Sequence, residues 1–372
     1  MTTFSSLGVS TDFHQALKEN GITTPTEIQE KAIPVLLHQE TDFIGLAQTG
    51  TGKTAAFGLP ILQNIDPNKN EIQALILSPT RELVQQINKQ LFRFTKYAPT
   101  KIFSEELYGG MKIDVQIANL KRPTHFIVAT PGRLVDLIER GALDLTKIKT
   151  IVLDEADEML SMGFKQDLNR ILNYTNGTRN TWLFSATMPV EIQKIIQTYM
   201  SPDAQRVSVD VDTLINKNIT HQFSVVNGKE KYNTLVSFLE QNPEGRGIVF
   251  CKTRAGVQNL TEYLLEDEFN VAGIEGEMGQ RDRDKVMRAF KKGTKQVLIA
   301  TDVAARGIDV KDLAFVIHYQ LPEQLEYYTH RSGRTARAGK KGISLALVTA
   351  TELGRMREIE ADLQIRAQQI SI

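Results

Sequence analysis

Residues 43–54, FIGLAQTGTGKT, carry the residue types that bind a phosphate group. A short apolar run stops at a turn in which Gly50 and Gly52 have no side chain to keep a phosphate away from the backbone N–H groups. Lys53 supplies a charge for the β and γ oxygens of a nucleotide, and the Thr54 hydroxyl is a ligand for Mg²⁺. The spacing predicts a strand, a phosphate-binding loop and a helix. The alternative is a glycine turn without a ligand.

A second reactive group, Asp154-Glu155-Ala156-Asp157, follows the apolar run TIVL. In a parallel α/β sheet, residues at the carboxyl ends of strands line the ligand crevice. There, Asp154 can hold Mg²⁺ directly or through water, and Glu155 can orient and deprotonate an attacking water. The alternative is a helix start that is rich in acids because the helix dipole favours them. The nearby phosphate loop favours the metal site.

Short runs of Ile, Val, Leu and Phe alternate with amphipathic stretches along the rest of the chain. Runs without polar alternation suit strands that are buried on both faces, and strand–helix repetition predicts a doubly wound, parallel α/β fold. In the first half the expected strands are residues 73–78, 125–129, 150–154 and 181–186. In the second half they are residues 221–226, 246–253, 270–274, 296–302, 314–319 and 342–348.

The organisation into domains follows from the length of 372 residues and from a loosening of the pattern near residue 200. We expect an N-terminal domain at 1–206, a linker at 207–218 and a C-terminal domain at 219–372. Helices broken near 21–25 should precede the phosphate loop, and the polar stretch after 353 should be helical to the end of the sequence. Only the first domain has a phosphate loop, which suggests a nucleotide held between two α/β lobes.

The composition excludes several classes of protein. The formal net charge is zero, so any anion site must be local. Cys251 is the only cysteine, which rules out an intrachain disulfide and favours a reducing, cytoplasmic location. We find no secretory signal pattern, no apolar run of membrane-spanning length and no His or Cys spacing typical of a metal site. We therefore expect no membrane partner.

The chain resembles the DEAD-box RNA helicases. AQTGTGKT at 47–54 and DEAD at 154–157 carry this resemblance, with Ala47 in place of a usual glycine. The other motifs of the family follow in order, which makes the set specific: PTREL at 79–83, a glycine pair at 109–110, TPGR at 130–133, SAT at 185–187, IVFCKT at 248–253, Gln280-x-x-Arg283, ATDVAARGID at 300–309 and HRSGRTARAG at 330–339. The resemblance spans residues 4 to about 350 and implies two RecA-like domains.

The resemblance implies ATP and Mg²⁺ as cofactors and assigns the residues that bind them. Gln29, in GITTPTEIQ at 21–29, would read adenine, because its amide offers one donor and one acceptor. Phe4 would pack near the base. Ile22 stands where the family usually has an aromatic residue, so stacking on adenine should be weaker. The remaining nucleotide contacts would come from Thr49, Gly50, Thr51, Gly52, Lys53, Thr54, Asp154, Gly307 and Asp309, with Thr54 and Asp154 as metal ligands.

The resemblance also assigns contacts with the RNA backbone, which position RNA without reading its sequence. These residues are Pro79, Thr80, Arg81, Gly110, Thr130, Arg133, Thr253, Arg283 and Thr301. From the residues alone, Thr80 and Thr130 could simply cap helices. Ser185 and Thr187 would couple the acidic motif to closure of the lobes.

Catalysis is assigned to Lys53, Glu155, Arg334 and Arg337. Arg331, Arg334 and Arg337 are spaced by three, so we expect them to share roughly one helical face. The alternative is a basic surface patch. As arginine fingers, Arg334 and Arg337 would reach the γ-phosphate and neutralise charge in the transition state.

The resemblance implies an ATP-dependent RNA helicase, in which RNA-stimulated ATP hydrolysis is coupled to lobe closure and to local duplex unwinding or remodelling of ribonucleoproteins. The same motifs would serve an ATP-gated RNA clamp in a ribonucleoprotein or RNA-decay complex, with protein partners there. A DNA-translocating motor is disfavoured by the DEAD, PTREL and Gln29 set.

Overall fold

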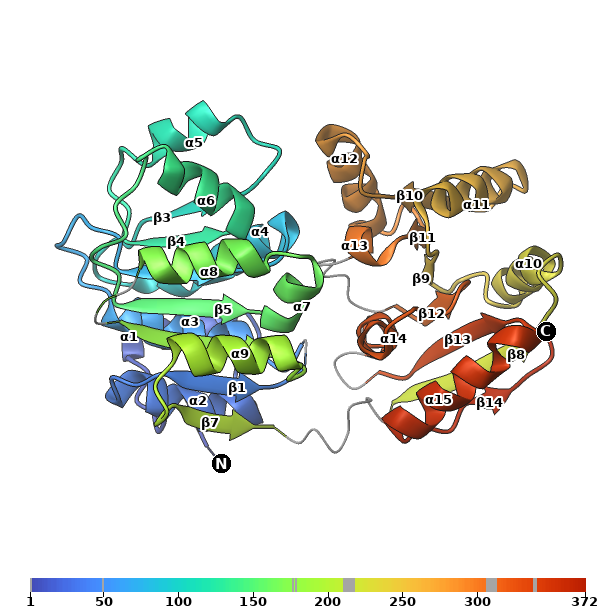
Figure 1. The fold of residues 1–372 in the computed structure, drawn as a ribbon, viewed down its shortest axis with the longest axis horizontal. Coiled ribbons are helices and arrows are strands. Elements are labelled where there is room, and N and C mark those ends of the chain that lie inside the picture. Colours follow the sequence, from blue (N-terminus) through green and yellow to red (C-terminus); the bar gives the residue numbers. More distant parts are fainter. Residues whose placement is uncertain are drawn as a thin grey trace. The chain divides into compact units, whose positions relative to one another are not determined.

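The computed structural model describes residues 2–48, 50–175, 177, 179–209, 218–305, 313–336 and 340–372. The chain folds as two compact units, Met1–Val211 and Asp212–Ile372. Each unit contains one β-sheet with helices packed against it (Figure 1). The predicted α/β class with two RecA-like lobes is thereby confirmed.

In unit 1 the sheet is parallel throughout, with the strand order β3-β4-β2-β5-β6-β1-β7. Its strands are β1 (Phe43–Leu46), β2 (Ala74–Leu77), β3 (Ser104–Leu107), β4 (Phe126–Ala129), β5 (Thr150–Asp154), β6 (Asn180–Ser185) and β7 (Gln205–Ser208). The helices of this unit are α1 (Thr11–Glu19), α2 (Glu27–His38), α3 (Lys53–Asn64), α4 (Arg81–Phe94), α5 (Ile113–Asn119), α6 (Pro131–Glu139), α7 (Ala156–Ser161), α8 (Lys165–Tyr174) and α9 (Val190–Tyr199), and η1 (Thr95–Tyr97) is a 3₁₀ turn.

In unit 2 the sheet is also parallel, with the order β10-β11-β9-β12-β13-β8-β14. Its strands are β8 (Ile219–Val225), β9 (Gly247–Phe250), β10 (Val271–Ile274), β11 (Val297–Ala300), β12 (Phe315–His318), β13 (Gly342–Val348) and β14 (Gln368–Gln369). The helices are α10 (Lys231–Gln241), α11 (Arg254–Glu266), α12 (Gln280–Lys291), α13 (Asp302–Ala305), α14 (Leu325–Ser332) and α15 (Leu353–Leu363), with the 3₁₀ turn η3 at Ala350–Glu352.

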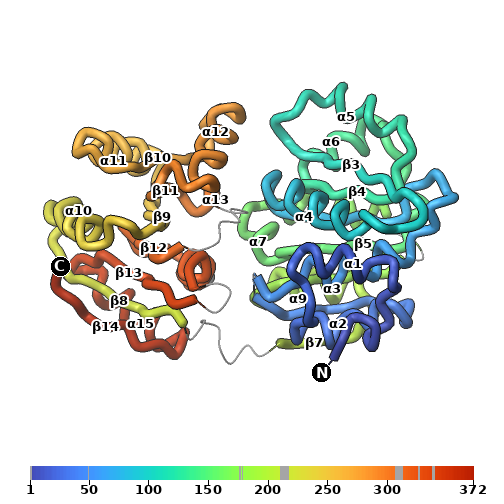
Figure 2. The backbone as a smooth tube through the Cα atoms, turned by 180° about the vertical axis from the view of Figure 1, so that it is seen from behind, coloured from blue at the N-terminus to red at the C-terminus, as the bar shows by residue number. Residues whose placement is uncertain are grey.

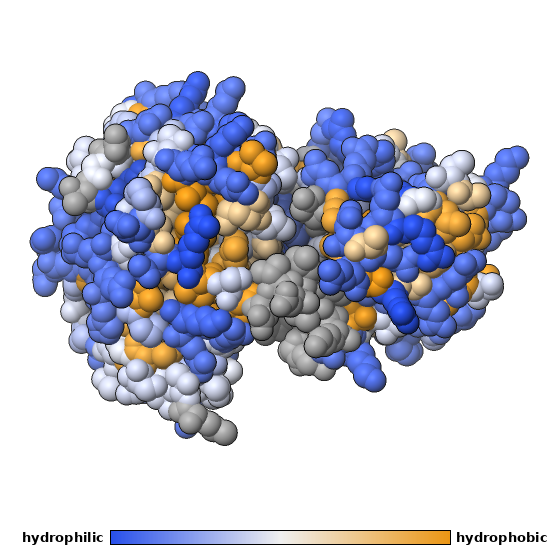
Figure 3. Space-filling model, turned by 60° about the horizontal axis from the view of Figure 1, so that its bottom comes forward, coloured by the Kyte–Doolittle hydropathy of each residue, from blue (hydrophilic) through white to orange (hydrophobic). Residues whose placement is uncertain are grey.

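Both faces of the first sheet are buried, as the unbroken apolar runs predict. Neighbouring residues of a strand point to opposite faces, so Ile76 and Val152 join one core cluster while Leu75 and Ile151 join the other. Polar side chains therefore have no place along the central strands and gather at the strand ends. Hydrophilic side chains predominate on the molecular face drawn in Figure 3, and the apolar ones form separate patches.

All eleven predicted strands are present, including the one before the phosphate loop, but the three edge strands β3, β7 and β14 were missed. β3 reads SEEL and β7 reads QRVS, because an edge strand can be polar. The prediction of helix to the end of the sequence was wrong after Leu363: Gln364 is left-handed, with φ 54°, and β14 pairs with β8. Apart from the undescribed segments, the chain has no helix long and apolar enough to cross a membrane.

Asp42 fixes β1, the strand that leads into the phosphate loop, to both of its neighbours. Its carboxylate accepts hydrogen bonds from the backbone N–H groups of Thr181 and Ser201, each at 2.6 Å. Thr181 belongs to β6, and Ser201 lies just before β7. Because Asp42 is itself buried, no water can easily replace these bonds.

We expect Asp42→Ala to destabilise unit 1 by about 2–4 kcal/mol, because it leaves two buried N–H groups without an acceptor. Urea unfolding followed by the fluorescence of Trp182, the only tryptophan of the chain and a β6 residue, reports on this unit. Asp42→Asn keeps one acceptor oxygen and should lose less. Equal urea midpoints for Asp42→Ala and the unmodified protein would contradict this role.

Candidate functional site

The phosphate loop has the backbone that the glycines predict. Gly50 and Gly52 have φ values of 87° and 93°, in the left-handed region that residues with a Cβ disfavour. Gly52 is the N-cap of α3, and the Thr51 hydroxyl donates to the carbonyl of Gln48 at 2.8 Å. Lys53 and Thr54 open the helix, so its unpaired N–H groups face the loop.

Lys53 and Asp154 form the electrostatic centre of unit 1. Both side chains are buried, and neither Lys53 Nζ nor Asp154 Oδ1 has a hydrogen-bond partner within the described chain. Burial raises the pKa of the Asp154 carboxyl, and the Lys53 ammonium opposes that rise. Buried polar atoms without partners are rare in native proteins, so this pair fits an anion held by Lys53 and a cation held by Asp154.

A magnesium ion fits this arrangement better than an all-protein metal site does. Within the described ranges, no three His, Cys, Asp or Glu side chains are grouped to hold a metal ion. Mg²⁺ typically uses one or two carboxylates, waters and the phosphates of a nucleotide. Asp154 at the end of β5 and the Thr54 hydroxyl at the start of α3 supply oxygen atoms that could bind such an ion.

Gln29 is tied to the phosphate loop. Its amide donates to the carbonyl of Gly52 at 3.0 Å and accepts from the backbone N–H of Thr26 at 3.0 Å. The side chain is only 2 % exposed. A second N–H and a second lone pair of the amide are left for a ligand, so the predicted contact with adenine stays a prediction.

Phe4 and Ile22 line one cavity of about 360 Å³ in unit 1. Phe4 is buried in the same core as α1 and α2, whereas Ile22 only packs against that core. The other residues around the cavity are Thr3, Ser5, His14, Leu17, Lys18 and Thr23. The structure thus brings together two of the predicted base contacts, whereas Gln29 is not among the lining residues.

Glu155 has a strained backbone at the point where β5 meets α7. It is the N-cap of α7, with φ 52° and ψ 52°, a left-handed conformation that is uncommon outside glycine. Such strain is retained where the surroundings enforce it, often at functional sites. It sets the direction of the Glu155 carboxylate relative to the buried Asp154.

The acidic motif is bonded to the predicted coupling residues through Asp157. One Asp157 oxygen accepts from the Thr187 N–H at 2.9 Å and from the Thr187 hydroxyl at 2.8 Å. The Ser185 hydroxyl donates to the carbonyl of Thr187 at 2.7 Å. The end of β6 is therefore held against α7, and Asp157 is a residue for which the sequence alone suggested no role.

Arg81 lies over an aromatic ring that sequence reasoning missed. The centre of its guanidinium is 4.7 Å from the centroid of Tyr108. Gln85, one turn further along α4, donates to the Tyr108 hydroxyl at 2.9 Å. The residue before Arg81, Thr80, caps α4 by accepting from the Leu83 N–H at 3.3 Å, as the simpler interpretation of Pro79-Thr80 predicted.

The glycine pair and the TPGR segment lie next to each other in unit 1. Arg133 donates to the carbonyl of Met111 at 3.0 Å, directly after Gly110, whose φ is 88°. Thr130 is the N-cap of α6, although its hydroxyl makes no capping bond. These segments share the carboxyl edge of the sheet with Arg81, because β2, β3 and β4 are neighbours.

In unit 2, the predicted RNA residues also lie at the carboxyl ends of adjacent strands. Thr253 follows β9 and caps α11, accepting from the Gly256 N–H at 3.0 Å. Thr301 follows β11, and its hydroxyl accepts from the Ala304 N–H at 3.4 Å. Arg283 of α12 donates to the carbonyl of Ala304 at 2.8 Å. Arg283 and Thr301 therefore both contact Ala304 of α13, and Thr253 follows β9, the strand next to β11.

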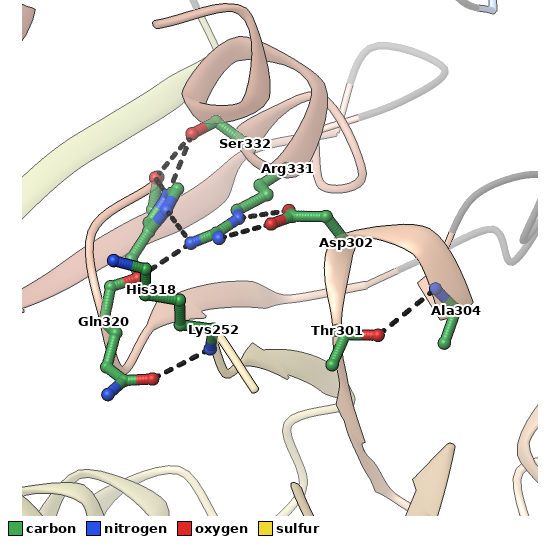
Figure 4. A network of polar contacts seen from close by, with 9 residues as sticks. Lys252, Thr301, Asp302, Ala304, His318, Gln320, Arg331 and Ser332 are labelled. Carbon is green, nitrogen blue, oxygen red and sulfur yellow. Dashed lines mark hydrogen bonds and ion pairs between the residues drawn. The ribbon is translucent and has the colours of Figure 1, made fainter. Parts of the chain in front are cut away.

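Arg331 is the centre of a buried polar network in unit 2 (Figure 4). Its guanidinium makes two bonds to Asp302, at 2.6 and 2.7 Å, and one to the carbonyl of Gln320 at 2.8 Å. His318 next to it has a pKa well below its usual value because of burial and this cation. Burial also raises the pKa of the Cys251 thiol to about 12.

The expectation that Arg331, Arg334 and Arg337 share a helical face was wrong. Helix α14 ends at Ser332, with Gly333 as its C-cap, and Ala336 has a φ of 56°. Arg331 is buried against Asp302, whereas the half-buried Arg334 lies in the turn that follows. The glycine and the left-handed residue break the helix before the spacing of three can align the arginines. Thr49, Gly307, Asp309 and Arg337 lie outside the described residues.

Family models and characterised relatives both match this chain. The DEAD/DEAH box helicase profile matches residues 26–195, and the helicase conserved C-terminal domain matches residues 230–339. The chain is 44% identical over 361 residues to the DEAD-box ATP-dependent RNA helicase CshA of Bacillus cereus, covering 97% of this chain and 68% of the relative. The chain belongs to the DEAD-box helicase family. The predicted family is thereby confirmed.

Solved structures of other DEAD-box proteins share the fold. One is Dbp5 of S. cerevisiae bound to RNA and ADP BeF3, with a TM-score of 0.91, 29% identity and coverage of 100% of this chain and 96% of that one. Another is Mss116p bound to ssRNA and AMP-PNP, with a TM-score of 0.88, 29% identity and coverage of 100% and 80%. These neighbours hold the two kinds of ligand that the helicase motifs predict.

We expect Gly52→Ala to weaken ATP binding to this helicase more than Gly50→Ala does. A Cβ on Gly52 would lie 2.4 Å from the Gln29 amide nitrogen, whereas a Cβ on Gly50 would meet nothing within 4 Å. Both positions have a similar left-handed backbone, so the difference in ATP affinity between the two variants reports on the displacement of Gln29. Titration with a fluorescent ATP analogue should show a difference of about tenfold, or 1.4 kcal/mol. Equal affinities would show that the contact between Gln29 and Gly52 is unimportant for ATP.

Proposed function

We propose that this DEAD-box helicase uses RNA-stimulated ATP hydrolysis to separate short RNA duplexes or to remodel ribonucleoproteins, through closure of its two lobes. The observation that carries the proposal is the buried pair Lys53 and Asp154, whose unpartnered atoms match a nucleotide phosphate and its cation. We assign ATP and RNA as the substrates because the chain belongs to a family of ATP-dependent RNA helicases.

The phosphate end of ATP is assigned to α3 and β5. Lys53 contacts the β- and γ-phosphates, and the N–H groups at Gly50 and Gly52 face their oxygens. Mg²⁺, held by Asp154 and Thr54, would neutralise the charge that develops on the phosphates when bound. Thr49 and Thr51 complete the loop. Glu155 takes a proton from the attacking water, since it follows Asp154 directly and is held at the start of α7.

The base is assigned to the segment before the phosphate loop. Phe4 and Ile22 border the cavity of unit 1, and Gln29 lies between α2 and the loop. An isoleucine offers no π-face for stacking, so the selection of adenine depends more on the Gln29 amide here than in relatives with an aromatic residue.

RNA is assigned to the carboxyl edges of both sheets. Unit 1 contributes Pro79, Thr80, Arg81, Gly110, Thr130 and Arg133, and unit 2 contributes Thr253, Arg283 and Thr301. Backbone N–H groups at helix starts, hydroxyls and arginines contact phosphates and 2′-hydroxyls without reading bases. ATP and RNA should therefore favour each other's binding when the lobes close.

Coupling and turnover are assigned to three further sets of residues. Ser185 and Thr187 connect the end of β6 to the acidic motif through Asp157. Arg334 and Arg337 reach the γ-phosphate on closure, and Gly307 and Asp309 contact the ribose and the γ-phosphate side. The buried Arg331, which pairs with Asp302, lies at the end of α14, directly before the turn that carries Arg334. We place the reaction in the cytoplasm, with RNA-decay or ribonucleoprotein components as protein partners.

The first test is ATPase activity with and without single-stranded RNA, together with Glu155→Gln. RNA should stimulate the wild type, and loss of the base should lower kcat by about 10²–10⁴-fold while ATP and RNA stay bound. Glu139→Gln, an exposed acid of α6, is the matched control. Hydrolysis that ignores RNA would overturn the proposed function. Near-normal turnover in Glu155→Gln would remove only the base assignment.

A second test concerns the ring beneath Arg81. Tyr108→Leu should weaken RNA binding about tenfold in the presence of a non-hydrolysable ATP analogue, because Arg81 loses its buried cation–π contact. Tyr108→Phe keeps the ring and should bind RNA nearly as the wild type does. Combining Tyr108→Leu with Arg81→Ala should add little to Arg81→Ala alone. Additive losses would show that Tyr108 acts independently of Arg81.

A further inference from the structure

The outer face of α12, together with its C-cap residue Lys292, carries a row of four basic side chains, which we call the α12 stripe: Arg281, Lys285, Arg288 and Lys292. Successive members are separated by four, three and four residues, so on an α-helix they fall within about 60° of one another. All four are exposed, whereas Met287 and Phe290 on the opposite side are buried.

The stripe lacks carboxylate partners, which some basic residues on other helices have. Lys31 pairs with Glu27 at 2.7 Å, and Arg355 pairs with Glu358 at 2.8 Å. In the part of the chain that the structure describes, no member of the stripe forms a salt bridge. Arg288 only donates to the backbone carbonyl of Asp284, at 3.2 Å.

The acids of α12 lie beside the stripe and do not neutralise it. The Asp284 carboxylate accepts from Gln280 at 2.7 Å, on one flank. Asp282 is exposed on the other flank, about 100° from Arg281 around the helix axis. Lys291 adds a further exposed charge close to the row. The face therefore keeps a concentrated positive potential.

This arrangement is unfavourable for the helix by itself. Like charges three and four residues apart repel each other along a helix. The helix dipole favours Arg288 and Lys292 near the C-terminus but disfavours Arg281 in the first turn. An isolated helix would be more stable with some of these residues neutral, so the stripe is best explained by an external polyanion that compensates it.

The position of α12 indicates which polyanion. Its first turn contains Arg283, bonded to Ala304 beside Thr301, where the proposed function places RNA. Figures 1 and 2 show α12 next to α13 at the edge of unit 2. The stripe lies on the other side of α12 from Arg283 and extends ~16 Å from Arg281 to Lys292. RNA that continues past the first turn of α12 would meet this row.

We propose that the α12 stripe binds the phosphate backbone of RNA flanking the segment held by the motif residues. The inference rests on the proposed function, because that function assigns Arg283, in the first turn of the same helix, to RNA. It adds a second contact, outside the motifs, that would tether the helicase to longer or structured RNA. The evenly spaced cations suit a phosphate backbone and need no base contacts.

The test uses Lys285→Gln, Arg288→Gln and Lys292→Gln together, and leaves Arg281 unchanged because it adjoins Gln280. Lys69→Gln, Lys101→Gln and Lys147→Gln, all exposed in unit 1, remove the same charge and serve as the control. Affinity is measured with a non-hydrolysable ATP analogue for two RNAs. One is the shortest single strand that saturates the ATPase, and the other is that strand extended at both ends.

The extended RNA should bind the wild type and the control more tightly than the short RNA does. The stripe variant should bind the extended RNA about tenfold or more weakly than the wild type does. Its slope of log Kd against log salt for that RNA should be smaller by about two. Its affinity for the short RNA and its melting temperature should not fall. An extension that adds no affinity to the wild type, or a stripe variant that keeps the full gain, would overturn the proposal. If no single-stranded RNA stimulates the ATPase, so that no such short strand can be found, the proposed function is overturned instead.

Discussion

The burial of both sheet faces decides where this protein can do chemistry. The central strands β2 and β5 have apolar side chains packed on both faces, and in β5 only the first and last residues, Thr150 and Asp154, are polar. A charged group can therefore enter only at the strand ends, and Asp154 is the last residue of β5. Burial disfavours its charge, and Lys53 at the start of α3 offsets this. The position of the proposed nucleotide site follows from that constraint.

The contacts around the site connect neighbouring motifs to one another. Gln29 bonds the segment before the loop to Gly52, and Asp157 bonds the acidic motif to Thr187. In unit 2, Asp302 and Arg331 join the ends of two elements far apart in the sequence. Each bond makes the position of one motif depend on another. A ligand that shifts one of them changes the energy of the next, which is the physical requirement for coupling between sites.

The central strands and the phosphate loop could be predicted from the sequence, because the strands are apolar runs and the loop has a characteristic spacing of glycine, lysine and threonine. The edge strands β3 (SEEL) and β7 (QRVS) could not be predicted, because they are less buried and their residues therefore do not follow an apolar pattern. The shared face expected for Arg331, Arg334 and Arg337 failed because Gly333 ends α14. Tyr108 was missed because stacking on Arg81 joins two strand ends that only the fold brings together.

The single cysteine has a practical consequence. Cys251 is enclosed at the end of β9, and its thiol stays protonated at neutral pH. Because the thiolate is the reactive form, maleimide reagents should leave it alone while the protein is folded. One new surface cysteine on each unit could then carry a donor and an acceptor dye without replacing the native residue. Energy transfer between the dyes would follow the separation of the two units through a cycle of ATP turnover.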